Sequence, residues 1–502
     1  MALSLLLPFL FLIYVLYSLY TSYKRRMSLL QSCGFPIVPS NSIIGHLSLF
    51  SSPKSFEEYG NLSTENGKTY GLLNGGMSTV VTSDESVIRQ LCVEKYSSFH
   101  SHSLDPLEED CYSRKDGHLF NSRGGRWKRL RTVMTGAFSL RAMRIWLPRM
   151  HENTLQLVDQ LPTGKSVDVH GLLQGHTSSV IDSCSLSNGG GEKWKRVVRS
   201  FGSETSIPPH WIVYVFPEIS IIVRFYKRMI SYIKKEDNAL TTFTSFLMNQ
   251  SHHRSKNEQK FDFFQILRDA MIETEVEGEE ELTMEEEDGT FLIEKMKVKK
   301  WITREECASQ LRFVSIAGFD TTSNTLAFFL HLLAIHQDVQ EQIRSEVYAV
   351  EVNMQSISDL PYLQCCILEC LRLFPHASPL HSRVCCSTTN INGMIFKKGV
   401  RVVIDTWSVH KSKQIWGEDA LEFRPQRFSN WDPSKQLYIP FGLGPRQCIG
   451  MRFALLEMKI AIVCILQRFR INPVPGITMR VTARDTNTIW PSGIKVSFDL
   501  LL

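Results

Sequence analysis

A glycine-rich segment at residues 441–450, with the sequence FGLGPRQCIG, constrains this chain more than any other feature. Its cysteine, Cys448, comes directly before a predicted helix at 452–466. The free N–H groups and the dipole of a helix N-terminus favour a thiolate, which is the form of cysteine that ligates a metal. The glycines let the backbone pass close to a flat ligand, and Arg446 supplies a cation for a carboxylate. Together these features suit haem.

A cysteine that only caps a helix would explain Cys448 but not the glycines, Phe441 and Arg446 at these spacings. The segment is similar to the haem-ligating signature of the cytochrome P450 family, Phe-x-x-Gly-x-Arg-x-Cys-x-Gly, and matches it at every fixed position. The resemblance implies haem b (heme b) with Cys448 as the axial iron ligand and Phe441, Arg446 and Gly450 as haem-binding residues. It also implies a mainly α fold with a small β region, in which a long central helix and the cysteine loop hold the haem.

Glu369 and Arg372 resemble the family's helical Glu-x-x-Arg pair, and Arg427, in the segment 423–428, resembles its second arginine. Residues three apart share a helix face, so Glu369 and Arg372 can meet. Arg427 can then complete a buried charge network that holds the cysteine loop. A Glu-x-x-Arg pattern by itself is more often an exposed ion pair, but its order along the chain favours a structural role here.

Residues 317–322, with the sequence AGFDTT, resemble the family's oxygen-activation motif. They lie in a long apolar stretch that opens with a capping-box pattern at 303–306, which predicts a central helix. The resemblance implies that Ala317 borders the haem, where it and Gly318 leave room. Thr321 can bond to the carbonyl of Ala317, which bends a helix and opens a slot for dioxygen and water above the haem. Asp320 adds a titratable group for proton delivery. A packing helix, whose small residues only permit close approach, is the alternative.

Trp127 and Arg131 resemble family contacts to the haem propionates, and Arg383 falls near another such position. The spacing from Pro375 to Arg383 is one residue longer than the family pattern.

Five basic residues predict a face that would dock an acidic reductase: Arg126, Lys128, Arg129, Arg452 and Lys459. Ordinary solvated side chains are the alternative. The resemblance implies electrons from NADPH through a membrane-bound flavoprotein reductase, with cytochrome b5 as a further candidate donor. The net charge of +5 without a concentrated basic stripe gives no reason to expect a nucleic-acid partner.

Residues 1–23 carry no charge, and 3–20 are almost continuously apolar before three consecutive cations at 24–26. A membrane-spanning helix needs roughly 20 residues, and flanking cations stay on the cytosolic side. We therefore expect a transmembrane anchor at 1–23, a basic and proline-containing hinge at 24–45, and a cytosolic haem domain at 46–502. A cleaved signal peptide is the alternative, but the segment lacks a basic start and a small-residue cleavage site.

With the resemblance, this topology implies a single-pass, microsomal protein of the endoplasmic reticulum membrane. Twelve sparse cysteines, some adjacent to each other, indicate a reducing compartment and not a disulfide scaffold. Asn61 and Asn249 begin glycosylation patterns that only a lumenal domain could use, and so they provide a test of topology.

Four further segments carry local predictions. Residues 69–82 and 391–405 mix β-branched residues with glycines and predict hairpins. Ten acidic residues and no basic residue lie in 273–288, which is typical of a solvated linker, with partner docking as the alternative. The apolar segment 211–216 suits either the bilayer surface or ordinary helix packing.

The sequence therefore favours a monooxygenase that inserts one oxygen atom of dioxygen into a lipophilic xenobiotic, steroid or fatty acid. The segment 371–453 most resembles the animal group of broad-specificity drug and steroid oxidisers, nematode members included. A peroxide isomerase or dehydratase of the same fold is one alternative, although such enzymes often depart from the acid-threonine pair. A non-catalytic haem sensor or carrier is the other.

Overall fold

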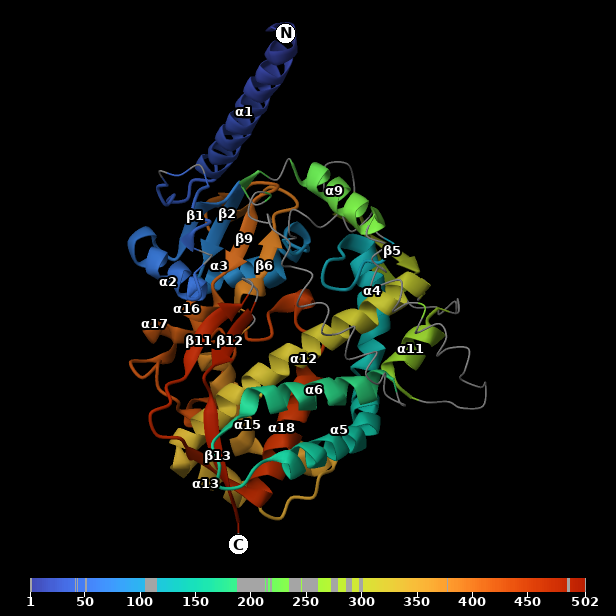
Figure 1. Cartoon of the computed structure of the whole chain (residues 1–502), viewed down its shortest axis with the longest axis vertical. Coiled ribbons are helices and arrows are strands. Elements are labelled where there is room, and N and C mark those ends of the chain that lie inside the picture. Colours follow the sequence, from blue (N-terminus) through green and yellow to red (C-terminus); the bar gives the residue numbers. More distant parts are fainter. Residues whose placement is uncertain are drawn as a thin grey trace.

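The computed structural model describes residues 2–40, 42, 44–49, 52–103, 115–186, 213, 215–216, 219–233, 245, 261–271, 279–285, 291–297, 301–376, 378–484 and 488–501. The fold is mainly helical with a small β region, as predicted. The largest sheet lies at the end of the molecule nearest the N-terminal helix, and the long helices cross one another in the other half (Figure 1).

The described α-helices are α1 (Ala2–Gln31), α2 (Ser55–Asn66), α3 (Glu85–Arg89), α4 (Gly124–Ala137), α5 (Leu140–Gln160), α6 (Val169–Ser185), α9 (Ser220–Ile233), α11 (Phe263–Asp269), α12 (Arg304–Ile335), α13 (Gln337–Val347), α14 (Met354–Ser358), α15 (Pro361–Leu373), α16 (Thr406–Lys411), α17 (Lys413–Trp416) and α18 (Met451–Arg468). Short helical turns are η2 (Gln90–Glu94), η3 (Tyr96–Ser98), η5 (Ser378–Leu380), η6 (Pro425–Phe428) and η7 (Gly444–Arg446).

The long helix α12 is the predicted central helix, and it crosses the middle of the molecule against α6 (Figure 1). Its start is the predicted capping box. The Glu306 N–H donates to Thr303 Oγ1 and the Thr303 N–H donates to Glu306 Oε2, both at 3.1 Å. These two bonds satisfy N–H groups that a helix start leaves without a partner. Residues 306–311 and 322–330 of α12 are buried. Apolar side chains from both stretches pack into the main hydrophobic core with those of α5, α6 and α18.

The four-stranded sheet has the order β1-β2-β9-β6. The antiparallel hairpin of β1 (Thr69–Asn74) and β2 (Met77–Thr82) confirms the first predicted hairpin. β2 runs parallel to β9 (Arg401–Ile404), which is antiparallel to β6 (Ser382–Val384). The remaining strands form a three-stranded sheet and three hairpins: β10 (Phe469–Pro473) with β13 (Lys495–Leu500) and β3 (Val167–Asp168), β11 (Arg480–Arg484) with β12 (Thr488–Ser492), β4 (Glu279–Glu285) with β5 (Phe291–Lys297), and β7 (Thr389–Ile391) with β8 (Met394–Phe396).

Two local predictions need correction. The second hairpin is formed by β7 and β8 and turns at Asn392-Gly393, because 401–404 instead pairs with β2 and buries its valines. The acidic segment was predicted to be a linker, but its described part is strand β4. In that strand Glu279 lies opposite Lys297 and Glu281 opposite Lys295 in the backbone register with β5.

The N-terminal helix α1 extends beyond the expected anchor, through the basic residues to Gln31. Its last turns pack on the sheet, where Leu30 is fully buried and Ser78 Oγ donates to the carbonyl of Arg26 at 3.0 Å. Among the residues that the structure describes, no helix combines the length and the apolar character needed to cross a membrane. The side chains of residues 1–12, a large part of the expected anchor, lie outside that description.

Candidate functional site

The cysteine loop connects η7 to the start of α18. The Cys448 N–H donates to the Phe441 carbonyl at 2.8 Å, and the Gln447 N–H donates to the Gly444 carbonyl at 2.9 Å. These bonds close the loop, so Cys448 stands two residues before Gly450, the N-cap of α18. The predicted position of the cysteine, at a helix N-terminus, is confirmed.

The Cys448 side chain is exposed, yet protein atoms enclose it closely enough that burial raises its thiol pKa. The two observations together mean that the sulfur faces a hollow inside the protein and not the outer surface. The backbone N–H groups of Gly450 and Met451 and the Arg131 guanidinium all oppose the rise in pKa. The same groups would stabilise a thiolate that ligates a metal.

Different constraints explain why glycine stands at three positions of the loop. Gly442 and Gly444 both have positive φ, 77° and 73°, which a residue with a side chain adopts only at a cost. A Cβ on Gly444 would also lie 1.9 Å from the Cys92 carbonyl oxygen of η2. Gly450 has an ordinary φ of −85°, and a Cβ there would lie 3.9 Å from the Cys448 sulfur. Close packing against the protein itself, which the sequence did not indicate, therefore explains Gly444.

Arg446 is buried and clamps the loop to the segment before α4. Its Nε donates to the His100 carbonyl at 2.8 Å, and Nη2 donates to the Ser122 carbonyl at 2.6 Å. Its guanidinium carbon lies 4.4 Å from the centre of the Trp127 ring. The predicted haem-binding residues Arg446 and Trp127 are thus in contact.

Arg131, one turn after Trp127 on α4, donates from Nη1 to the Gln447 carbonyl at 2.9 Å and so joins α4 to the loop. Tyr96, which the sequence did not single out, lies at the centre of this region. Burial raises the pKa of its phenol, and three nearby guanidinium groups oppose the rise: Arg446, Arg383 and Arg131. Four predicted haem-binding residues, including Trp127, therefore gather around one point.

Arg383 lies in β6 and is 3% exposed. Its Nη1 is 3.1 Å from His102 Nδ1, while its buried Nε has no hydrogen-bond partner among the described residues. A buried N–H without a partner costs free energy unless a ligand accepts its hydrogen bond. Converging guanidinium groups, a donor without a partner and an enclosed but accessible thiol together fit haem, whose flat ring carries two carboxylates.

The motif in α12 lies on a stretch in the middle of this helix that is not packed on all sides. Residues 316–321 are exposed or half-buried, between buried residues 314–315 and 322–330. Thr321 Oγ1 donates to the Ala317 carbonyl at 2.6 Å, the bond that the sequence predicts. Thr177 Oγ1 of α6 donates to the Phe319 carbonyl at 2.9 Å. Two carbonyls of the motif therefore accept hydroxyl protons, which favours a local bend in the helix.

The other residues of the motif have separate positions. A Cβ on Gly318 would lie 2.6 Å from the Ile181 Cδ1 atom of α6, so this glycine serves helix packing, as the alternative interpretation held. Asp320 is half-buried beside Thr321, and its carbonyl accepts from Ser323 Oγ at 3.1 Å. The packing explanation therefore applies to Gly318 but not to the accessible pair Asp320 and Thr321.

The segment before α4 connects α12 with the cysteine loop. The Leu119 N–H donates to Gln310 Oε1 of α12 at 2.8 Å, and Gln310 Nε2 donates to the Gly117 carbonyl at 3.2 Å. Arg446 donates to the carbonyls of Leu119 and Ser122 from the other side. The motif helix and the cysteine loop are thus held by the same short segment.

The predicted charge network is formed and buried. Glu369 and Arg372 are both fully buried, with Arg372 Nε 2.6 Å from Glu369 Oε2 and Nη2 2.9 Å from Oε1. Arg427 Nε donates to Glu369 Oε1 at 2.9 Å. The backbone N–H of Arg424 donates to the same oxygen at 3.0 Å. One carboxylate therefore joins α15 to η6 and the segment before it.

The network reaches the cysteine loop through backbone groups that the sequence did not indicate. Arg372 Nη1 donates to the carbonyls of His410 and Ala420 at 2.6 and 2.7 Å. The buried His410 ring accepts the Ile439 N–H at 2.9 Å, two residues before the loop begins. Tyr438 stacks on this ring and donates to the Leu368 carbonyl at 2.9 Å.

The predicted basic face is mostly wrong. Arg126 and Arg129 both pair with Glu306 of the α12 capping box, with Nε–Oε1 and Nη2–Oε1 distances of 2.9 and 2.7 Å. Lys459 is buried and donates to the Ile357 carbonyl at 3.2 Å. These three charges hold the fold together, because each found an acceptor from a distant part of the chain.

Comparisons with known proteins agree with the geometry. The family model described as Cytochrome P450 matches residues 36–491. Three similar proteins of Caenorhabditis elegans carry the name "Putative cytochrome P450", with the designations CYP13A5, CYP13A7 and CYP13A10. CYP13A5 is 30% identical over 433 residues, which are 82% of this chain and 82% of that protein. CYP13A7 is 30% identical over 85% of this chain and 86% of its own length. CYP13A10 is 29% identical over 96% and 97%.

Proposed function

Since this chain belongs to the cytochrome P450 family of haem monooxygenases, whose iron is ligated by a cysteine, we propose that it oxidises lipophilic small molecules with dioxygen. In this proposal the electrons come from an NADPH-dependent flavoprotein reductase. The main observation in support of this proposal is that the Cys448 thiol faces an internal hollow at the N-terminus of α18. Bound haem supplies the redox-active iron. In this proposal Cys448 ligates the iron, while Trp127, Arg131, Arg383 and Arg446 hold the haem carboxylates.

Thr321 and Asp320 are proposed to hold and deliver protons. The Thr321 hydroxyl donates to the Ala317 carbonyl, so the lone pairs of its oxygen stay available to accept from a water molecule. Asp320, adjacent and half-buried, provides a carboxyl that can exchange a proton with that water. An isomerase that rearranges a peroxide has no need of delivered protons, and neither does a haem carrier. The pair therefore favours the monooxygenase.

The Thr321→Ala variant is expected to keep haem and substrate binding, consume NADPH at a comparable rate, and release at least about tenfold more hydrogen peroxide per product. Without the hydroxyl, Thr321 would no longer hold the water that delivers protons, which would favour release of hydrogen peroxide over product. The ratio of peroxide to product measures this. Ser179→Ala is the matched control, because Ser179 Oγ makes the same kind of bond, to the Gly175 carbonyl at 2.9 Å on α6. A Thr321→Ala variant as well coupled as this control would remove the proposed role.

A row of stacked rings beside the motif supports a lipophilic substrate. His102 stacks on Phe120 at 4.3 Å between ring centres, Phe120 faces Phe313 at 6.0 Å, and Phe313 stacks on His118 at 4.7 Å. Phe313 is one helical turn before Ala317, so the two share a face of α12. This aromatic row would present an apolar surface next to the proposed reaction site.

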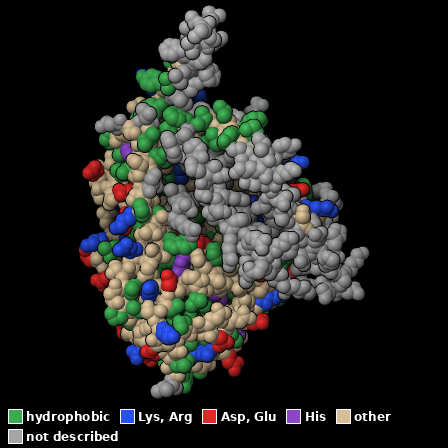
Figure 2. Space-filling model, viewed as in Figure 1, with side chains coloured by type: hydrophobic (Ala, Val, Ile, Leu, Met, Phe, Trp, Pro, Cys, Tyr) green, Lys and Arg blue, Asp and Glu red, His purple; other side chains and the backbone are tan. Residues whose placement is uncertain are grey.

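Attachment to the endoplasmic reticulum membrane, with a single-pass anchor at 1–23 and a cytosolic catalytic domain, is the proposed location. The sequence pattern of residues 1–26 supports it. A second support is α9, where four exposed apolar residues share one face: Ile222, Phe225, Tyr226 and Met229. α9 and α1 lie at the same end of the molecule, where apolar side chains gather on the surface (Figures 1 and 2). Of the apolar segment 211–216, the structure describes 213, 215 and 216, and the buried Val213 and Val215 agree with the packing alternative for these residues.

In a translation assay with microsomes, Asn61 and Asn249 are expected to stay unglycosylated, while an acceptor site placed ahead of Met1 is glycosylated. The cations at 24–26 hold the following domain on the cytosolic side. Asn61 is exposed in α2, so its position would not block the modification, and Asn249 lies outside the described residues. A glycosidase-sensitive increase in apparent mass that Asn61→Gln or Asn249→Gln removes would show that the domain lies in the lumen.

The proposed electron donor is the flavoprotein reductase, with cytochrome b5 as a second donor. Of the five predicted contact residues, Lys128 on α4 and Arg452 at the start of α18 remain for a docking surface. Arg452 is exposed and Lys128 is half-buried. Both lie on helices that hold the cysteine loop, which supports docking of an acidic partner on this side of the protein.

A further inference from the structure

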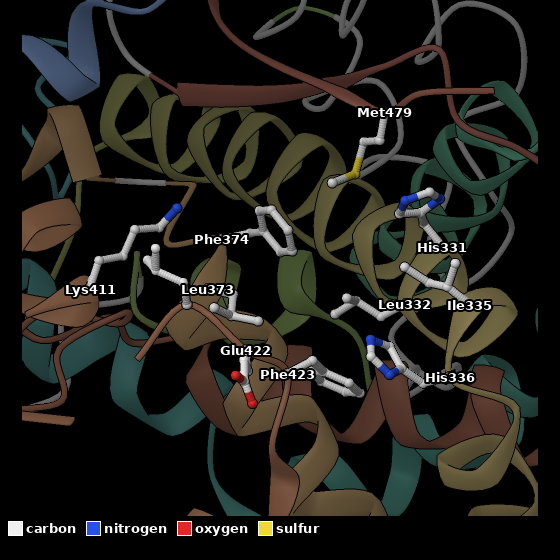
Figure 3. A pocket seen from close by; sticks show the side chains of 11 residues that line it. His331, Leu332, Ile335, His336, Leu373, Phe374, Lys411, Glu422, Phe423 and Met479 are labelled. Atoms are coloured by element: carbon white, nitrogen blue, oxygen red, sulfur yellow. The ribbon is translucent and has the colours of Figure 1, made fainter. Parts of the chain in front are cut away.

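A hollow of about 670 Å³ lies between the C-terminal ends of α12 and α15, and we refer to it as the α12–α15 hollow (Figure 3). It is separate from the proposed reaction site. Its lining includes no residue of the cysteine loop or of the motif at 317–322. His331, the lining residue of α12 nearest to the motif, is ten residues beyond Thr321, which is about 15 Å along a helix.

Apolar side chains form most of the wall. Phe374 is held by face-to-face stacking on Phe328 of α12, with 4.4 Å between ring centres. At the rim, Leu421 is 65% exposed and Ile335 is 51% exposed. Large apolar side chains in contact with water at the edge of a concave site favour an apolar ligand, since each Å² that a ligand covers contributes about 25 cal/mol.

One cation stands at the end of the hollow opposite the histidines. Lys411 lies there with Leu373, while His331 and His336 lie at the other end (Figure 3). The Lys411 Nζ atom is 3.4 Å from the centre of the Trp407 ring. Burial lowers the pKa of Lys411 to about 8, and a nearby Arg372 adds to this effect.

The acidic residues around Lys411 do little to neutralise its positive charge. Glu57 of α2 raises the pKa of Lys411, but its carboxylate lies 3.7 Å from Lys54 Nζ in an exposed pair. The Glu422 side chain is exposed, and its carboxylate points away from Lys411 (Figure 3). Lys411 is half-buried, and a partly desolvated ammonium group gains more from an added anion than a fully solvated lysine does.

From these features we propose that the α12–α15 hollow is a second ligand site that binds a long-chain carboxylate such as a fatty acid. The carboxylate pairs with Lys411, and the chain lies along Leu373, Phe374 and Leu332 toward Ile335. No reaction occurs at this site. The site does not depend on the oxidation chemistry proposed above, so either can fail alone.

The experiment measures equilibrium binding of radiolabelled dodecanoate to the purified full-length haem protein. An azole that ligates the haem iron is present in excess, so the haem pocket is blocked. We expect about one dodecanoate per protein to remain bound, and Lys411→Gln to weaken its affinity tenfold or more, as loss of a charge-assisted contact does. Lys413→Gln is the matched control, because Lys413 is exposed and pairs with Glu418 at 2.7 Å. Its affinity should equal that of the parent.

A second variant guards against a folding defect in Lys411→Gln. Leu421→Asp places an anion at the exposed rim and should also weaken dodecanoate binding, whereas Leu155→Asp, at an exposed position on α5, should not. Haem content reports correct folding of every variant. Loss of all dodecanoate binding when the azole is present would overturn the proposal. Equal affinities of Lys411→Gln and Lys413→Gln would also overturn it, as would equally tight binding of methyl dodecanoate, which has no charge.

Discussion

The Cys448→Ala protein is expected to lose completely the red-shifted Soret band that a thiolate-ligated haem shows in its reduced, carbon monoxide-bound form. The sulfur of Cys448 faces the internal hollow, and the groups around it favour a thiolate: two backbone N–H groups and the Arg131 guanidinium. A methyl group can neither ligate iron nor donate electron density to it. Oxidation of substrate should therefore also disappear. Absorption spectra of the reduced protein with carbon monoxide measure the first effect directly.

Cys386→Ala is the control for this variant, because Cys386 is also accessible but lies after β6, where its thiol donates to the Val384 carbonyl at 3.5 Å. It should keep the parent spectrum. A folded Cys448→Ala protein that retained the red-shifted band would show that another group ligates the iron. A globin-like spectrum in the folded parent would exclude thiolate ligation altogether.

Glu369→Ala is expected to destabilise the protein by roughly 3 to 5 kcal/mol and to prevent stable haem incorporation. The substitution leaves Arg372 fully buried without its counter-ion and removes the acceptor for Arg427 Nε. The carbonyls of His410 and Ala420 still accept from Arg372, but they carry no charge to balance the guanidinium. Since a domain is stable by only about 5 to 15 kcal/mol, this loss is a large part of the total.

Haem content per protein and the midpoint of thermal unfolding measure the effect. Glu341→Ala is the matched control, because Glu341 also pairs with an arginine three residues along a helix, Arg344, but its side chain is 61% exposed. Exposed pairs contribute at most about 1 kcal/mol. A Glu369→Ala protein with the haem content and unfolding midpoint of this control would mean that the buried network has no structural role.

Features that depend on neighbours along the chain could be predicted. The Thr321 bond to Ala317 joins residues four apart, and the capping box at Thr303 joins residues three apart. In both cases helix geometry alone brings the groups together. The position of Cys448 before α18 is local in the same sense. The spacing of Glu369 and Arg372 likewise predicted their contact.

Features that depend on distant segments could not be predicted. Arg126 and Arg129 look like surface charges along the chain, but Glu306 lies about 180 residues away and pairs with both. Gly444 owes its identity partly to the Cys92 carbonyl, and Gly318 to a side chain of α6. Neither cause leaves a sign in the local pattern.

The sequence by itself determined the local groups of the candidate site: a cysteine at a helix start, an acid and an alcohol on a helix turn, and a glutamate within reach of an arginine. Only the tertiary structure decided which charges are buried, which carbonyls receive the donors of Arg372 and Arg446, and where the α12–α15 hollow lies. The physical reason is the separation along the chain of the residues that make each contact. Local bonds follow from the fixed geometry of a turn of helix, whereas burial and hollows depend on how helices far apart in the chain pack.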